Sequence, residues 1–499
     1  MAEKTIIIIG AGIAGLSAGC YAQMNGFRSQ IFELHSLPGG LCTAWERKGY
    51  VFDGCIHYLW GTREGQPFYP LLHELGIVPQ RDVFHHADLL QVISPEGDRL
   101  IAYADLGQLQ DHMLAISLED RPLIGELVRG VRDFCDFDFS TMLMKPREMW
   151  SVWDWRRFGQ AMTPFLPSMA KWGMQTANSF ARRFKHPFLK EAVAQMFGWS
   201  EIPMMAGLMQ MAYLTNRNAG FPIGGSLEVA RAVEKRYLEL GGVIHYRSQV
   251  EKILVEDDRA VGVRLYNDEI HRADYILSAA DGRGTLFDML DQRYVPPEMR
   301  RIYDGRFPIH TVMQVSIGIR RAMTTAPHWA IYLLPKPMLI AGQEYSEMSV
   351  KSFGFDPTLA PEGCTALNVL LKTSYGYWQR IYGRRLYDTE QDQVADLVIG
   401  FLDTIYPGID KDIDYIDVCT PLSYERYTGN WQGSVCGWLL TRETQPMMIQ
   451  GMRKTLPGIN NFYMAGHWVE PGGSVPVVAM SGRNAVQLIC RDSGRPFQP

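Results

Sequence analysis

Three glycines near the start of the chain, Gly10, Gly12 and Gly15, have the spacing G-x-G-x-x-G. This spacing is typical of a loop that binds the pyrophosphate of a dinucleotide. The first glycine permits a tight turn, the second lets the backbone approach the phosphates, and the third lets a helix pack closely on a strand. Glu33 lies eighteen residues beyond Gly15. A carboxylate at that distance accepts hydrogen bonds from ribose hydroxyls and repels a 2′-phosphate.

The residues around the glycines predict the strand, helix and strand that must position such a loop. Residues 5–9, Thr-Ile-Ile-Ile-Ile, are β-branched throughout, which is typical of a strand buried on both faces of a parallel sheet. Residues 13–25 predict a helix that ends at Gly26, and residues 29–34 predict a second strand. Residues 5–22 carry no charge, but their four glycines argue against a signal peptide or a membrane span.

Length and composition limit the classes of protein to which the chain can belong. The chain has 499 residues, about three domain lengths at roughly 150 residues each. Its net charge of −5 argues against a nucleic-acid partner, which normally requires a basic surface. None of the eight cysteines forms a C-x-x-C pair, so no metal site is indicated. Scattered cysteines in a long chain are typical of reduced thiols, and we expect a cytoplasmic protein.

Other segments predict further parts of the same domain. Residues 243–280 alternate short apolar runs with turn residues, which predicts several strands. Residues 461–465 predict a short buried strand, and a loop then leads into a final helix over residues 474–490. Ser474 is its N-cap candidate, and Pro476 falls in its first turn, where a missing N–H group costs nothing.

Residues 140–211 are rich in methionine and tryptophan, with basic residues between them. One interpretation is an ordinary helical core. The other is a tunnel around a long apolar molecule together with a membrane-facing patch, because methionine adapts to apolar ligands and tryptophan with arginine suits a bilayer interface. The sequence leaves both interpretations open.

Two further glycine-containing segments, Pro38-Gly39-Gly40 and AGHWVEPGGSVP (465–476), carry a resemblance. With the first glycine loop, they make the chain similar to the phytoene desaturase-like, carotenoid isomerase and retinol saturase-like flavoproteins of the flavin amine oxidase superfamily. The resemblance is strong over residues 5–61, 220–280 and 460–486. It implies an α/β fold with a Rossmann-type FAD-binding domain, a discontinuous α+β substrate domain and a helical lid.

The resemblance also implies how these domains are interleaved along the chain. The FAD-binding domain is expected over residues 1–85, 216–290 and 456–499. The helical lid and substrate region is expected over residues 86–215, and the second part of the substrate domain over residues 291–455.

The resemblance assigns residues to FAD. The expected cofactor-binding residues are Gly10, Gly12, Ala14, Gly15, Glu33, Leu34, Gly39, Gly40, Leu41, Val250, Ala279, Gly466, Val475 and Pro476. In the family, the first loop and the acidic residue hold the ADP half, the paired glycines lie by the pyrophosphate, and Val250 contacts the adenine. The last helix points its positive end at the flavin, where the reduced ring carries negative charge.

The candidate catalytic residues are His57, His467 and Glu470. Hydride transfer occurs at flavin N5, so the protein need only bind the substrate, exclude water and move a proton. An imidazole titrates near neutral pH and could exchange that proton. His57 stands in D-G-C-I-H-Y, which resembles the saturase-like motif. For each histidine, the alternative is a structural hydrogen bond to the loop backbone.

The resemblance implies an FAD-dependent oxidoreductase that acts on C–C bonds of a long apolar isoprenoid or carotenoid-like substrate, by desaturation, saturation or isomerisation. Two alternatives stay open. A flavin amine oxidase would use aromatic residues such as Tyr424, Tyr427 and Trp431, and a non-redox protein would bind a prenyl lipid. The expected partner is an apolar small molecule, a peripheral membrane contact is left open, and the sequence does not indicate an oligomeric state.

Overall fold

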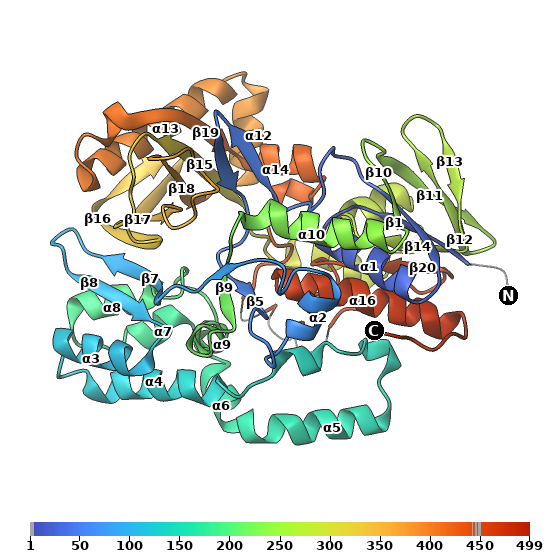
Figure 1. Cartoon of the computed structure of the whole chain (residues 1–499), viewed down its shortest axis with the longest axis horizontal. Helices are drawn as coiled ribbons and strands as arrows, with labels where there is room; N and C mark the ends of the chain where they lie inside the picture. Colours follow the sequence, from blue (N-terminus) through green and yellow to red (C-terminus); the bar gives the residue numbers. More distant parts are fainter. Residues whose placement is uncertain (1–3, 442, 445–446, 448–450) are drawn as a thin grey trace.

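A computed structural model describes residues 4–441, 443–444, 447 and 451–499 of the chain. Its first domain is built on a parallel five-stranded sheet with the order β10-β2-β1-β14-β20. These strands are β1 (Thr5–Ile9), β2 (Arg28–Phe32), β10 (Val243–His245), β14 (Tyr275–Ser278) and β20 (Phe462–Met464). The strand predictions of the sequence are therefore confirmed, and the sheet is assembled from three distant parts of the chain (Figure 1).

The isoleucines of β1 explain why this strand lies at the centre of the sheet. Ile6 and Ile8 pack into the core that contains α1 (Ile13–Met24) and α16 (Val475–Asp492). Ile7 and Ile9 face the other core, which an antiparallel meander covers. The meander consists of β11 (Val250–Glu256), β12 (Arg259–Leu265) and β13 (Ile270–Arg272). Burial on both faces accounts for a strand without polar alternation.

Three helices cover the first face of the sheet, namely α1, α16 and α10 (Gly225–Glu239). Helix α16 lies very close to α1, because a Cβ atom at Gly482 would overlap the carbonyl oxygen of Ala14. The last helix of the chain is thereby fixed against the first one, and its N-terminus reaches the same edge of the sheet as the glycine loop (Figure 1).

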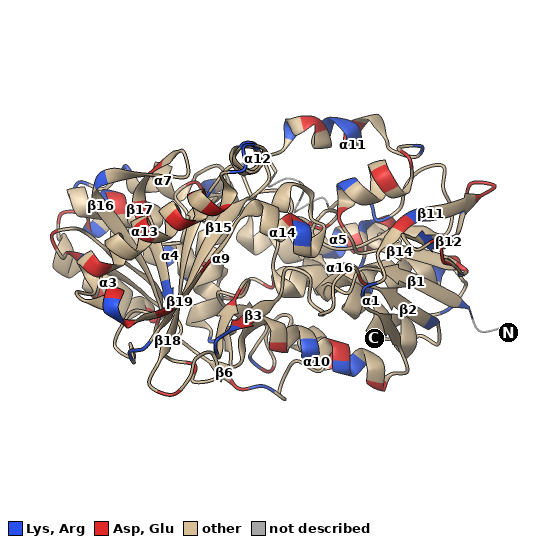
Figure 2. Ribbon diagram, turned by 90° about the horizontal axis from the view of Figure 1, so that it is seen from above, with Lys and Arg blue, Asp and Glu red and all other residues tan. Residues whose placement is uncertain are grey.

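The second domain contains a mixed seven-stranded sheet with the order β19-β15-β18-β17-β16-β7-β8. Its strands are β7 (Asp88–Ile93), β8 (Arg99–Tyr103), β15 (Val312–Ile319), β16 (Trp329–Ile340), β17 (Gln343–Ser352), β18 (Thr365–Lys372) and β19 (Ile413–Cys419). Helices α12 (Tyr375–Gly383), α13 (Tyr387–Ile405) and α14 (Pro421–Thr428) accompany it. Figure 2 shows the two domains as two lobes with β3 (Ala44–Arg47) lying between them. Strand β3 forms an antiparallel hairpin with β4 (Tyr50–Asp53).

Helices fill most of the region between β8 and β9 (Ala219–Pro222). They are α3 (Leu106–Ile116), α4 (Arg121–Phe134), α5 (Val152–Met162), α6 (Leu166–Trp172), α7 (Ala177–Ala181), α8 (Pro187–Gln195) and α9 (Met204–Thr215). The methionine- and tryptophan-rich segment divides in two. Trp172 and the methionines of α9 lie largely in the core, whereas Trp153 and Trp155 of α5 are 66% and 53% exposed. Among the described residues, no helix combines the length and apolar character of a membrane span.

The structure confirms the expected α/β class with a Rossmann-type domain and a second, discontinuous domain. One local expectation needs refinement. Ser474 occupies the N-cap of α16, but its hydroxyl does not cap the helix. The expected domain limits remain a prediction, although β7 and β8, which belong to the segment expected to form the lid, pair with the sheet of the second domain.

Candidate cofactor and active site

The first glycine loop follows β1 directly and has the conformation that its glycines permit. Gly10 has φ +95°, in the left-handed region that favours glycine. A Cβ atom at Gly15 would overlap the carbonyl oxygen of Gly10, so the third glycine is required for packing. Gly12 is the N-cap of α1 and provides no side-chain cap. The first N–H groups of α1 are therefore available to an anion.

Glu33 lies at the end of β2 and is 6% exposed. Its Oε2 accepts a 2.6 Å hydrogen bond from the N–H of Ala11, and its Oε1 accepts a 2.8 Å bond from the N–H of His35. Burial raises the pKa of this carboxyl group, and the two backbone donors act in the opposite direction. Leu34 follows and lies near Gly429 of the second domain. The carboxylate is thus held beside the glycine loop, where a ribose would meet it.

The paired glycines form a second turn over the first loop. Gly39 and Gly40 both have positive φ, +107° and +60°. The N–H of Gly39 donates a 2.8 Å bond to the carbonyl of Ala11, and a Cβ atom at Gly40 would lie 3.3 Å from the Cα atom of Gly12. Leu41 continues the turn. The backbone of these glycines therefore surrounds the predicted pyrophosphate position on two sides.

The remaining predicted cofactor residues approach the same edge of the sheet. Ala279 extends β14 and donates a 2.9 Å hydrogen bond to the carbonyl of Ile9. Gly466, with φ +101°, follows β20 and lies beside Ala14. Val250 begins β11 and is buried on the far face of the sheet, in the core that also contains Phe32.

The N-terminus of α16 forms the other end of the site. Val475 and Pro476 are its first two residues, and no side chain caps it. The hydroxyl of Ser474 is buried without a hydrogen-bond partner. A buried hydroxyl with no partner and an uncapped helix N-terminus both favour an acceptor of negative charge at this point. The residues present therefore fit FAD, with the phosphates at the N-terminus of α1 and the flavin near the N-terminus of α16.

The candidate catalytic residues lie in different environments. The Nε2 atom of His467 lies 3.2 Å from Oδ1 of Asn430, which also accepts a hydrogen bond from the indole of Trp468. Burial lowers the pKa of His467 to about 4, so its imidazole is neutral at physiological pH. The ring of His57 stacks on Trp329 with a 4.7 Å separation between centroids. Both histidines are thus fixed and uncharged.

Glu470 forms an ion pair with Lys454, and the two side chains are 6% and 3% exposed. The N–H of Glu470 also donates a 2.9 Å bond to the carbonyl of Gly466. A carboxylate that neutralises a buried ammonium group has a structural task, namely to hold the loop that follows β20. Whether it also moves a proton stays a prediction.

Sequence reasoning missed a buried polar cluster at the end of β4. Asp53 accepts hydrogen bonds from the N–H and the hydroxyl of Ser226, at 2.5 and 2.8 Å, and from the N–H of Cys55 at 3.0 Å. Lys351 of β17 places its ammonium 2.7 Å from Nδ1 of His57. Asp53 was visible within the motif that contains His57, but nothing in the sequence around Lys351 indicates a site.

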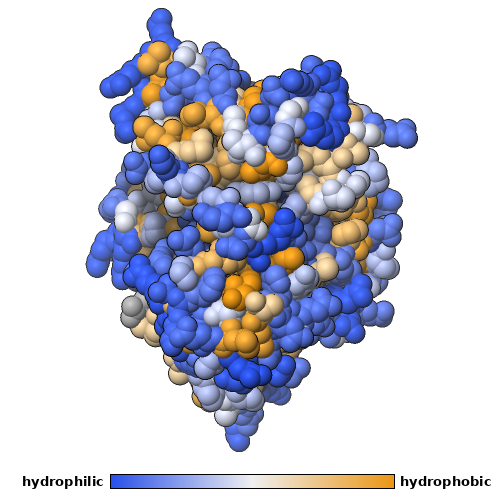
Figure 3. Space-filling model, turned by 90° about the vertical axis from the view of Figure 1, so that its left-hand side faces the viewer, coloured by the Kyte–Doolittle hydropathy of each residue, from blue (hydrophilic) through white to orange (hydrophobic). Residues whose placement is uncertain are grey.

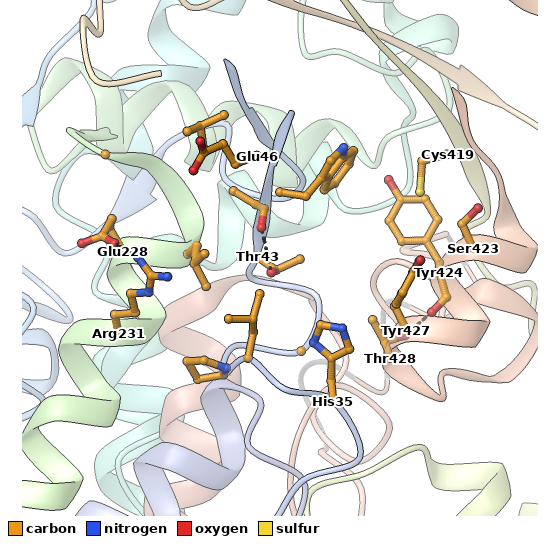
Figure 4. Close-up of a pocket in the computed structure, with 18 of the residues that line it drawn as sticks. His35, Thr43, Glu46, Glu228, Arg231, Cys419, Ser423, Tyr424, Tyr427 and Thr428 are labelled. Carbon is orange, nitrogen blue, oxygen red and sulfur yellow. Dashed lines mark hydrogen bonds and ion pairs between the residues drawn. The ribbon is translucent and has the colours of Figure 1, made fainter. Parts of the chain in front are cut away.

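A cleft of about 2130 Å³ opens between the two domains. Glu33 and Gly40 line it together with α10, the β3–β4 hairpin and α14. In Figure 4, Glu228 and Arg231 stand on one wall, whereas Tyr424 and Tyr427 stand on the opposite wall. Ligand sites typically measure about 300–1,000 Å³, so this cleft has space for more than one compact ligand.

The aromatic residues named for an amine oxidase are not all at this cleft. Tyr424 and Tyr427 line it, but Trp431 packs in a separate aromatic cluster with Tyr303 and Trp438. A second cleft of about 990 Å³ lies in the second domain, and none of the expected cofactor residues lines it. Figure 3 shows the molecule from that end, with apolar patches separated by hydrophilic side chains. Within the described residues, no three histidine, cysteine or acidic side chains gather as metal ligands.

A parallel dinucleotide-binding sheet, two glycine turns at its edge and a second domain across a large cleft define an FAD-dependent oxidoreductase. The chain belongs to the family of flavin containing amine oxidoreductases, whose profile matches residues 13–490. The cofactor of this enzyme is FAD, in agreement with the fit of the residues described above.

Individual relatives are distant but match nearly the whole chain. The prolycopene isomerase of Daucus carota is 23% identical over 99% of this chain and 81% of its own length. The lycopene-forming phytoene desaturase of Pseudescherichia vulneris is 22% identical over 98% of this chain and 99% of its own. Among solved structures, cyclohexylamine oxidase from Brevibacterium oxydans superposes with a TM-score of 0.61 at 14% identity, over 99% of this chain and 100% of its own, which shows a shared fold.

Proposed function

We propose that the enzyme uses FAD to desaturate, saturate or isomerise C–C bonds of a long apolar isoprenoid or carotenoid-like molecule. The observation that carries this proposal is the match of nearly the whole chain to relatives named for carotenoid substrates. The cleft of about 2130 Å³ supports it, because it adjoins Glu33 and Gly40 of the predicted FAD site and exceeds the volume of one compact ligand. FAD supplies hydride transfer when it is bound, and the neutral His57 and His467 are the groups that could move the accompanying proton.

An anaerobic visible spectrum of the purified holoenzyme tests this proposal. A polyisoprenoid in detergent should bleach the flavin band if the enzyme desaturates it. If it does not, the flavin is photoreduced and a polyene is added, and recovery of the band would show saturation. Substrate isomer analysis by chromatography under both conditions detects isomerisation. Bleaching by amines alone would establish an amine oxidase, and a stable lipid complex without any flavin response would favour a lipid carrier.

We further propose that the enzyme is cytoplasmic and contacts a membrane through α5. All eight cysteines, each within the described residues, are free thiols, as in reducing compartments. Helix α5 lies along the lower edge of the molecule (Figure 1) and exposes Val152, Trp153 and Trp155. Arg156 and Arg157 follow on the same exposed helix. Exposed tryptophans next to arginines suit the headgroup region of an anionic bilayer.

Sedimentation with vesicles of phosphatidylglycerol and phosphatidylcholine tests the contact. The double variant Trp153→Ala/Trp155→Ala should bind about tenfold more weakly or worse, because it loses most of the exposed apolar area of α5. Leu339→Ala/Tyr382→Ala is the matched control, since these side chains are 66% and 65% exposed elsewhere. Equal binding of both variants would overturn the proposal. Loss of self-association in the α5 variant would instead assign α5 to an interface between copies.

A further inference from the structure

Lys351 is a lysine buried in the second domain, on β17, with 6% of its surface exposed. Its ammonium lies 2.7 Å from Nδ1 of His57 and donates a 3.2 Å hydrogen bond to the carbonyl of Ile56. The ring of Phe353 lies 5.3 Å from it. Burial of a charged ammonium group costs free energy unless neighbouring groups compensate its charge. The contact between Lys351 and His57 therefore requires an explanation.

The protonation states of the pair follow from its surroundings. Burial lowers the pKa of Lys351 to about 8, while Asp53 and Cys55 act to raise it. Burial and the charge of Lys351 hold the pKa of His57 well below its usual value, and His310 and His328 act in the same direction. At neutral pH, Lys351 is therefore an ammonium and His57 a neutral imidazole.

This pairing selects one tautomer of His57. An ammonium group can only donate, so Nδ1 of His57 must accept and the ring proton must reside on Nε2. Stacking on Trp329, at an interplanar angle of 14°, fixes the plane of the ring. Trp329 is itself anchored by a 2.9 Å hydrogen bond from its indole to Ser349. One donor, Nε2–H, is thereby held in a single orientation.

The surroundings of the pair extend toward the N-terminus of α16. Gly473 precedes that helix and lies against Cys436. The Sγ atom of Cys436 lies 3.7 Å from Nδ1 of His310, which when protonated would lower the pKa of His57. His310 therefore lies in contact with Cys436 beside the start of α16 and within electrostatic range of His57.

We propose that Lys351 is a positioning residue that acts through His57, fixing it as an Nε2–H donor and exchanging a proton with it at Nδ1. The inference rests on the proposed function. When a C=C bond is reduced, bound FAD would supply the hydride to one carbon. The other carbon, which receives the π electron pair, would take the Nε2 proton of His57. Nδ1 of His57 then takes a proton from the ammonium of Lys351, which is left neutral. Desaturation runs through the same steps in reverse.

Several titratable groups surround Lys351, and their places determine what a pH profile reports. Asp53 ends β4, and Cys55 and His57 follow it. His86 and His328 approach from the segments before β7 and β16, where their rings stack at 3.5 Å. The pKa values of these two imidazoles are lowered to about 2 and about 4, so they stay neutral. Lys351 is then the group that titrates near pH 8.

Histidine ¹⁵N NMR of the holoenzyme tests the inference without any substrate. The signals of His57 are assigned by their loss in His57→Gln. They should show the neutral Nε2–H tautomer from pH 5 to pH 7.5 in the natural protein and in Lys351→Arg. In Lys351→Met, they should show mixed tautomers and protonation nearer the ordinary value. An unchanged tautomer and titration in Lys351→Met would overturn the inference.

A matched control and an activity profile complete the test. Lys372→Met removes an exposed lysine at the end of β18 in the same sheet and should leave His57 unchanged. The amount of bound FAD and the melting temperature show whether each variant is folded. If Lys351→Met does not fold, the tautomer of His57 in Lys351→Arg is the result that tests the inference. With a polyene that the enzyme converts, the kcat of Lys351→Met at pH 7 should be about 100-fold lower than that of the natural enzyme. The pH profile of this variant should also lack the change in rate near pH 8. Absence of polyene turnover would refute the proposed function, whereas the NMR result would still decide the role of Lys351.

Discussion

The backbone N–H of Ala11 donates a 2.6 Å hydrogen bond to Oε2 of Glu33, so a side chain at the end of β2 holds the glycine loop that follows β1. The same carboxylate accepts from the N–H of His35 through its other oxygen. Glu33 therefore has two tasks, because it orders the loop and keeps lone pairs available for a ribose.

Glu33→Ala should weaken FAD binding about 10- to 100-fold, because it removes the ribose acceptor and leaves a buried N–H unpaired, at a cost of about 1–3 kcal/mol. Quenching of flavin fluorescence on titration into the apoprotein measures the affinity. Glu46→Ala is the control, since Glu46 lines the same cleft but is exposed. Equal affinities in both variants would exclude this role of Glu33.

Two glycines of the first loop should respond differently to alanine. A Cβ atom at Gly12 would have no neighbour closer than 3.9 Å, whereas one at Gly15 would overlap the carbonyl of Gly10. Gly12→Ala should retain the melting temperature of the apoprotein but bind FAD poorly. Gly15→Ala should destabilise the fold by about 1–3 kcal/mol. Circular dichroism melting and bound flavin distinguish the two, and similar melting temperatures would contradict the packing argument.

The Lys454–Glu470 ion pair should stabilise the fold more when both residues are present than either residue does alone. Glu470→Gln leaves a buried ammonium without its counter-charge and should cost about 3–5 kcal/mol. The double variant Lys454→Met/Glu470→Leu should recover much of that loss. Urea unfolding measures both effects. If the double variant loses as much free energy of unfolding as the single variants Glu470→Gln and Lys454→Met lose together, the two side chains do not act as a pair.

Stability should fall in mild acid because of buried neutral histidines. Burial lowers the pKa of His310, His328 and His467 to about 4, below the unfolded value of about 6.5. The unfolded chain therefore binds protons first as the pH falls through 6.5, and folding loses stability until about pH 4. Each histidine contributes up to about 1.4 kcal/mol per pH unit in this range.

Urea midpoints at pH 7, 6 and 5 measure this dependence. His310→Gln and His328→Gln should each reduce the proton uptake on unfolding by about one proton below pH 6. A midpoint that does not change between pH 7 and pH 5 would contradict the burial of these imidazoles in neutral form.

The fold and the cofactor end of the site were predictable because local patterns specify them. A strand of one threonine and four isoleucines, a three-glycine loop and an acidic residue at the end of the next strand occur within thirty residues, and each has a direct physical reason. The structure places Glu33, Gly39 and Gly466 around this one loop. By contrast, the N-cap role of Ser474 was only partly predictable, because a capping serine and an uncapped one look the same in sequence.

The catalytic end was less predictable because long-range pairing creates it. Lys351 meets His57 only because β17 of the second domain approaches the loop after β4, and 293 residues separate them along the chain. The strand around Lys351 has no motif, and a buried lysine is indistinguishable there from an exposed one. Glu470 shows the converse, since its motif suggested chemistry and the structure gives it a counter-ion, Lys454.

The interleaved order of the first sheet has a consequence for biosynthesis. Its strands β1 and β2 are complete by residue 32, but β20 and α16 are translated only after residue 461. The pyrophosphate loop and the helix that would face the flavin therefore cannot come together until residues 475–492 have been made. Until then the nascent chain exposes an open edge of β14, which is a surface that chaperones bind and that aggregation exploits. Supply of FAD can act only after α16 has been translated, so riboflavin starvation should deplete the finished protein and leave the rate of its synthesis unchanged.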